Sequence, residues 1–194
     1  MATLAKTTQY RNNKIEPKQF ALWVGCASMM MLFAAFTSAY IVRQAGGNWY
    51  EFQLPTVFYT STVFIVASSL TLHGAFLSFK KDKEAMYKSL LVVTFLLGCA
   101  FLYFQYQGYL ALTSMGLPID GPVSGSFIYV ISAVHAAHVI GGLGTLIVAL
   151  VHAFGLPYKV TKRRKSRFAL VLTYWHFVDF LWIYLLVFFI SQQN

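Results

Sequence analysis

The stretch FALWVGCASMMMLFAAFTSAYIV, residues 20–42, contains no charged side chain. A helix of roughly 20 apolar residues crosses a bilayer core of about 30 Å. The stretch therefore predicts a membrane-spanning helix. A β-barrel is excluded, because its strands would show segments of about ten residues in which polar and apolar side chains alternate.

Four further apolar runs follow along the chain, so the pattern of the first stretch is repeated. They cover residues 54–79, 89–113, 125–154 and 168–190, and only 11% of the 194 residues are charged. The connections between the runs are short, which makes neighbouring helices antiparallel. We predict an all-α integral membrane protein with a bundle of five transmembrane helices. Residues 1–19 form an N-terminal tail and residues 20–194 form one membrane domain.

The Lys and Arg residues alternate between the two ends of the predicted bundle. Fourteen of the fifteen lie in the N-terminal tail and in the second and fourth connections, and the other is Arg43 in the first connection. The positive-inside rule assigns the basic segments to the cytoplasmic side, so the N-terminus is cytoplasmic and the C-terminus periplasmic. The net charge of +9 is thus a topology signal that favours contact with anionic lipid. No nucleic-acid partner is indicated.

Polar side chains at membrane depth are the candidate functional residues. Asp179 is the only acidic residue within a span, about 16 Å from the inner start of its helix. The antiparallel run 125–154 places His135 at the depth of Asp179 and His138 at the depth of His176. Each pair within a helix is spaced i, i+3 and shares a face. We therefore expect a cross-helix polar network of His135, His138, His176 and Asp179.

This network has several interpretations. The favoured one is structural: a satisfied hydrogen-bond cluster that fixes the register of the two helices. A proton path or a site for a lipid headgroup is an alternative, and a metal or haem site is a weaker one. No catalytic residue and no metal site are predicted. Small residues on two sides of the run 125–154 (Ala133, Ala137 and Gly141 on one, Gly142 and Ala149 on the other) suggest a helix that packs on both sides.

Three stretches resemble subunit III of the haem–copper oxidases. FIYVISAVHAAHVIGG, residues 127–142, resembles the histidine-containing helix of that family. YWHFVDFLW, residues 174–182, resembles the signature of its last helix, with Tyr174 and Trp175 at the start. ALWVGCASMMMLFAAFTSAYIVR, residues 21–43, resembles the third helix of the seven-helix form. The resemblance covers nearly the whole chain and matches the shorter, five-helix bacterial form.

The resemblance implies a non-catalytic subunit of a respiratory terminal oxidase in the bacterial cytoplasmic membrane. Its expected partners are the catalytic subunit I, which carries haem and copper, and subunit II. The expected role is to stabilise the catalytic subunit and to bind phospholipid, while the complex couples electron transfer to oxygen with proton translocation. Membership of a larger respiratory supercomplex is left open.

The chain departs from the family pattern at one position in its first helix. The family carries a buried glutamate in a stretch like ASEVMLF, and Met29 stands at that place here. No other acidic residue in the helix replaces it. A role of that glutamate in proton entry is therefore not expected of this chain.

Other functions stay open at the level of the sequence. Subunit III of a quinol oxidase shares the five-helix form, and similar subunits accompany nitric oxide reductases. A small proton-coupled transporter would explain a buried acid beside histidines, but the sequence shows no inverted repeat and no broken helix pair. A di-haem cytochrome would need two histidine pairs at matched depths. Only one such pair, His138 and His176, is available, because His135 is matched in depth with Asp179.

Overall fold

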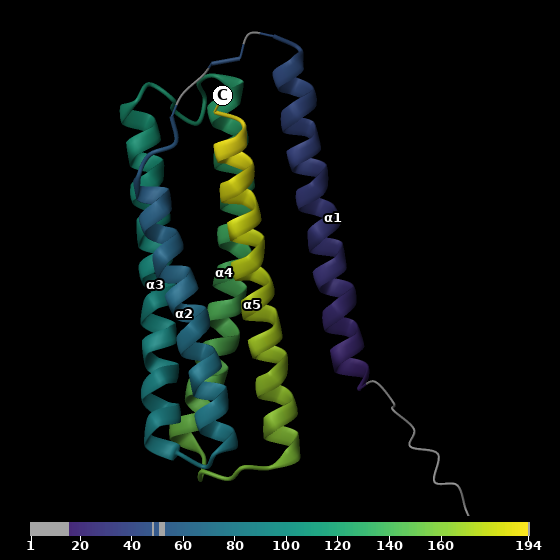
Figure 1. Ribbon diagram of the computed structural model, residues 1–194, viewed down its shortest axis with the longest axis vertical. Coiled ribbons are helices and arrows are strands. Elements are labelled where there is room, and N and C mark those ends of the chain that lie inside the picture. Colours follow the sequence, from purple (N-terminus) through teal and green to yellow (C-terminus); the bar gives the residue numbers. More distant parts are fainter. Residues whose placement is uncertain (1–15, 48, 51–52, 194) are drawn as a thin grey trace, which may run out of the picture.

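Five long α-helices make up the chain in the computed structural model, which describes residues 16–47, 49–50 and 53–193 (Figure 1). All five are long and apolar enough to span a membrane, which confirms the prediction. The helices are α1 (Pro17–Ala45), α2 (Val57–Lys80), α3 (Glu84–Ser114), α4 (Val123–Gly155) and α5 (Lys162–Ser191). Of the predicted N-terminal tail, residues 1–15 lie outside the described residues and Pro17 already begins α1.

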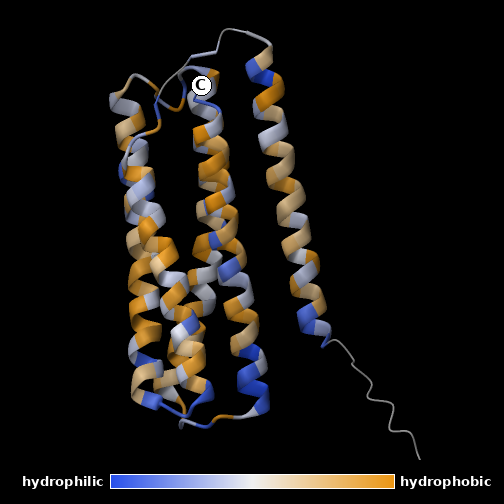
Figure 2. Ribbon diagram, in the orientation of Figure 1, coloured by the Kyte–Doolittle hydropathy of each residue, from blue (hydrophilic) through white to orange (hydrophobic). Residues whose placement is uncertain are grey.

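Four of the five helices extend beyond both ends of the apolar runs that predicted them, and α2 begins three residues after the start of its run. α5 begins at Lys162 instead of residue 168, and α3 begins at Glu84 instead of residue 89. Apolar composition marks the depth of the hydrocarbon, whereas a helix continues through the headgroup region for as long as its backbone is satisfied. Figure 2 shows the result as hydrophilic helix ends around an apolar middle. The Thr161 hydroxyl caps α5 by accepting the Arg164 backbone N–H at 3.2 Å.

Helices α2, α3, α4 and α5 form a four-helix bundle in which each packs on its two neighbours in the order α2–α3–α4–α5. α1 lies outside this bundle and packs on α4 and α5 (Figure 1). Within the described residues α1 does not pack on α2 or α3. One helix therefore has most of its surface free of contacts with its own chain.

α1 is held by a small set of side chains, most of them in its second half. Its buried residues are Phe33, Thr37 and Tyr40. Thr37 hydrogen-bonds the hydroxyl of Tyr184 in α5 at 3.0 Å, and the Tyr40 ring lies 5.2 Å from that of Phe188. The first half of α1 carries no buried residue, and Glu16, which precedes the helix, accepts a hydrogen bond from Ser166.

Candidate functional site

The four predicted polar side chains are all buried or half-buried, but they do not form one hydrogen-bond network. His135 and Asp179 are 1% and 8% exposed, and His138 and His176 are half-buried. No hydrogen bond within the described residues joins any two of the four. The expected pairing of His135 with Asp179 is absent, because neither ring nitrogen of His135 has a hydrogen-bond partner.

An aromatic cage surrounds His135. The ring of Trp182 in α5 lies 5.1 Å away, that of Phe101 in α3 lies 6.0 Å away, and that of Phe33 in α1 lies 6.3 Å away. Three large rings from three helices thus occupy the space where a carboxylate or a flat cofactor would have to sit. The aromatic contacts, rather than a polar partner, fix the position of this imidazole.

The two remaining histidines have hydrogen-bond partners elsewhere, whereas the buried Asp179 Oδ1 has none among the described residues. His138 Nδ1 contacts the carbonyl of Val134, one turn earlier in its own helix, at 2.8 Å. His176 Nδ1 hydrogen-bonds Ser69 in α2, and Asp179 lies near the same serine. The acid and its neighbour on α5 therefore face α2, where the sequence analysis had expected α4. A lone serine gives no signal in a sequence, so this partner was missed.

We expect a double-mutant cycle on Ser69→Ala and His176→Phe to show a coupling free energy of about 0.6 kcal/mol, and at most about 1.7 kcal/mol, as for other interhelical hydrogen bonds in membranes. The measurement is the free energy of unfolding in mixed detergent. The control cycle pairs Ser69→Ala with His135→Phe and should be additive within about 0.5 kcal/mol, because the two side chains share no hydrogen bond. Coupling in the control cycle alone would contradict the assignment.

Trp175, from the last-helix motif, joins three helices at the centre of the bundle. Its indole Nε1–H donates to the hydroxyl of Ser68 in α2 at 2.9 Å. Its ring covers two glycines, since a Cβ added at Gly98 of α3 or at Gly142 of α4 would lie 3.0 Å or 2.9 Å from the indole. Tyr174 donates from its hydroxyl to the carbonyl of His138 at 2.9 Å. The motif therefore ties α5 to α2, α3 and α4.

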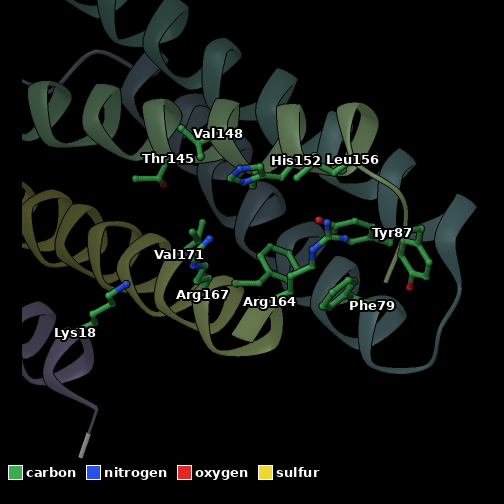
Figure 3. Close-up of a pocket in the computed structure, with 14 residues that line it drawn as sticks. Lys18, Phe79, Tyr87, Thr145, Val148, His152, Leu156, Arg164, Arg167 and Val171 are labelled. Carbon is green, nitrogen blue, oxygen red and sulfur yellow. The ribbon is translucent and has the colours of Figure 1, made fainter. Parts of the chain in front are cut away.

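A cavity of about 350 Å³ opens at the end of the bundle where α5 begins (Figure 3). Figure 3 shows Val148 and His152 of α4 on one side and Arg167 and Val171 of α5 on the other, with Lys18 of α1 nearby. Its apolar part includes Phe79, Tyr87, Ala149 and Phe168, and its basic part consists of Lys18, His152, Arg164 and Arg167. Among the described residues that line it, none is acidic.

The position of Arg164 and the protonation state of Tyr158 are both determined by their surroundings at the cavity. Arg164 donates from its guanidinium to the carbonyls of Pro157 at 2.9 Å and Lys159 at 3.4 Å, which holds its position. Burial, followed by the charge of Asp82, raises the pKa of the Tyr158 phenol, so this hydroxyl is a neutral donor near neutral pH. The cavity thus offers fixed positive charge and hydrogen-bond donors at one end and apolar surface at the other.

None of the four predicted polar residues lines this cavity. In the sequence, the basic residues of this cavity indicate only the orientation in the membrane. Their convergence depends on the meeting of α1, α4 and α5, which the sequence does not reveal. Met29, at the place of the family glutamate, is half-buried on α1. Across the described residues, no three His, Cys, Asp or Glu side chains come together as a metal site.

Comparison with known proteins gives a consistent result. The sequence profile of one family, described as Cytochrome c oxidase subunit III, matches residues 20–192. A probable cytochrome c oxidase subunit 3 of Mycobacterium bovis is 34% identical over 166 residues, which cover 82% of this chain and 80% of the relative. A cytochrome c oxidase subunit 3 of Corynebacterium diphtheriae is 30% identical, with 81% and 80% covered. A probable quinol oxidase subunit 3 of Staphylococcus haemolyticus is 25% identical, with 92% and 90% covered.

Proposed function

The chain belongs to the cytochrome c oxidase subunit III family, and from this premise we propose that it stabilises the catalytic subunit of a respiratory haem–copper oxidase and binds an anionic phospholipid. The observation that carries the lipid part is the cavity with a basic end and an apolar body. The reaction of the complex, electron transfer to oxygen coupled to proton translocation, belongs to the partner subunits.

Haem and copper are assigned to the partner subunits I and II. The histidines of this chain suit that assignment, because aromatic rings enclose His135 and His176 is engaged with Ser69. A haem held by an imidazole needs an open space beside the ring that ligates its iron. Such an arrangement would displace Trp182 or Phe101, both of which are fully buried.

The phosphate of the lipid would lie among Lys18, His152 and Arg167. Its acyl chains would follow the apolar residues Val148 and Val171. Each Lys or Arg near a membrane surface contributes about 1 kcal/mol to the binding of anionic lipid. A lipid held this way would bridge the first half of α1, which has no buried residue, to α4 and α5. The lipid would thereby complete the packing of the chain.

The proposed setting is the bacterial cytoplasmic membrane, with the basic end of the bundle on the cytoplasmic side. Lys80 and Lys81 at the end of α2 and Lys162 at the start of α5 belong to the same end as the cavity. The inner leaflet of a bacterial membrane carries anionic lipid, which matches the charge of the cavity. Cytochrome c is the proposed electron donor of the complex, because the two relatives compared above at 34% and 30% identity are named cytochrome c oxidase subunit 3. A quinol is the alternative donor, since the relative named quinol oxidase subunit 3 is 25% identical.

The lipid proposal is tested with the double variant Lys18→Ala/Arg167→Ala. We expect it to bind anionic phospholipid about thirtyfold more weakly than the unchanged chain, because two positive charges of about 1 kcal/mol each are lost. The measurement is the phospholipid content per chain of the purified complex, by mass spectrometry after delipidating washes. The control is Lys162→Ala/Arg163→Ala, which removes the same charge from exposed residues outside the cavity. Equal losses of lipid in both variants would mean that the lipid is attracted by the general positive charge of the surface and not bound in the cavity.

The stabilising role is tested in a strain that lacks this chain. The remaining oxidase is expected to start at a normal rate and to lose activity faster during turnover. Oxygen uptake of the purified enzyme over time is the measurement, and adding back the chain should restore the lifetime. An unchanged lifetime without the chain would contradict the role.

A further inference from the structure

One membrane-facing surface of the chain carries polar side chains at the depth of the hydrocarbon. It is the α2–α5 face, defined by Leu70, His73 and Leu77 of α2 and by His176 and Phe180 of α5. The three α2 residues are exposed and spaced i, i+3, i+7, so they lie on one stripe. Phe180 is 69% exposed, and His176 is half-buried between the two helices. An exposed imidazole therefore interrupts an otherwise apolar surface.

The side chain of His73 is not directed to the nearer end of its helix. Lys80 ends α2 seven residues later, about 10 Å along the axis. Side chains on a helix lean toward its N-terminus, so His73 leans away from Lys80 and toward the middle of the bundle. Its ring lies 5.7 Å from that of His176. A lipid headgroup at the end of α2 is therefore poorly placed to satisfy this imidazole.

Behind His73, polar groups continue into the core. His176 uses Nδ1 for Ser69, and Ser69 lies beside the buried Asp179. Among the hydrogen bonds of the described residues, none involves the His73 ring, and none involves Nε2 of His176. The α2–α5 face thus presents imidazole nitrogens that have no hydrogen-bond partner among the described residues. The bond from Ser69 fixes the orientation of the His176 ring.

The exposed face of α3 at the same depth has no such groups. Thr71 of α2 hydrogen-bonds Thr94 of α3 at 2.9 Å, so these two residues lie at the same depth in the bundle. The exposed residues of α3 there are Val93 and Leu96, and both are apolar. Acyl chains can cover such an apolar surface without any loss of hydrogen bonds, whereas they offer no hydrogen-bond partner to an imidazole.

We propose that the α2–α5 face is the docking surface for a transmembrane helix of a neighbouring oxidase subunit, and that this helix presents a hydrogen-bonding side chain, a carboxyl or hydroxyl group, to His73. The proposal rests on the proposed function, which places the chain in an oxidase complex. Polar side chains inside a membrane face protein or water rather than lipid, and they hydrogen-bond across helices. The imidazole pair is complementary to an acid or a hydroxyl group.

Photo-crosslinking in the intact complex tests this proposal. A photoreactive amino acid replaces Leu70 or Leu77, which flank His73 and leave it in place, and the control position is Leu96 of α3. After irradiation of native membranes, positions 70 and 77 are expected to crosslink to another oxidase subunit and position 96 to lipid. Crosslinks to lipid alone from 70 and 77, in a chain that still purifies with the oxidase, would overturn the docking surface.

The role of His73 itself is tested by substitution. His73→Leu is expected to lower the fraction of chain retained by the complex after detergent washing roughly threefold, the effect of one average interhelical hydrogen bond. His73→Gln, which keeps hydrogen-bonding groups, should restore most of it, and Leu96→Ala should have no effect. Equal retention of all variants would overturn the proposed contact. A chain that never purifies with haem protein would instead contradict the proposed function, so the two failures are distinct.

Discussion

Gly142→Ala is expected to destabilise the folded chain by about 1–3 kcal/mol, the usual cost of overpacking a closely packed core. The added methyl group would lie 2.9 Å from the indole of Trp175 and 3.2 Å from the ring of Tyr174. Both rings are fixed by hydrogen bonds, Trp175 to Ser68 and Tyr174 to the carbonyl of His138. A shift of either ring to make room for the methyl group would therefore strain its hydrogen bond.

The matched control lies two residues further along α4. A Cβ added at Gly144 meets nothing within 4 Å. Gly144→Ala therefore adds only the helix propensity of alanine, about 1 kcal/mol in favour of the helix. The two variants are compared by the free energy of unfolding in mixed detergent. Similar effects of Gly142→Ala and Gly144→Ala would mean that α4 and α5 do not approach through Gly142.

Trp175→Ala is expected to cost about 3–5 kcal/mol, the usual effect of removing a buried tryptophan ring. The side chain is 1% exposed and fills the space between Gly98 and Gly142. Its loss leaves a cavity at the junction of four helices and leaves the Ser68 hydroxyl without its donor. The measurement is the unfolding free energy, with accumulation of the chain in membranes as a second measure.

Trp175→Phe separates packing from hydrogen bonding. It keeps most of the ring and removes the N–H donor, so it should cost about 1–3 kcal/mol. The comparison variant is Phe180→Ala, which removes a ring that is 69% exposed and should change the stability of the isolated chain little. A Trp175→Ala variant as stable as Phe180→Ala would contradict the central position of the indole.

The five helices could be predicted from the sequence because each span is a continuous apolar run. The Gly142 side of α4 also behaves as the spacing of small residues predicts, since Gly142 is buried against α5. The opposite side is different: Ala133, Ala137 and Gly141 are exposed in this chain. Small-residue spacing indicates where helices can approach closely, but it does not say which neighbour, or which chain, approaches.

The partners of the buried polar residues could not be predicted from the sequence. Equal depth suggested that His135 would meet Asp179, and depth alone does not fix the rotation of each helix about its axis. In the structure α5 is turned so that Asp179 faces Ser69 of α2, and the cage of Trp182, Phe101 and Phe33 takes the place beside His135. The basic cavity was missed for a similar reason, because Lys18 and Arg167 are brought together by tertiary packing.

The most direct test of the proposed function is gentle detergent purification of the tagged chain from its native membrane, followed by an absorption spectrum and an oxygen-uptake assay. We expect haem absorbance and oxygen reduction to purify with the chain, and the chain to be colourless after it is separated from its partners. A chain that elutes alone, without haem protein and without oxygen reduction, would contradict its assignment as an oxidase subunit.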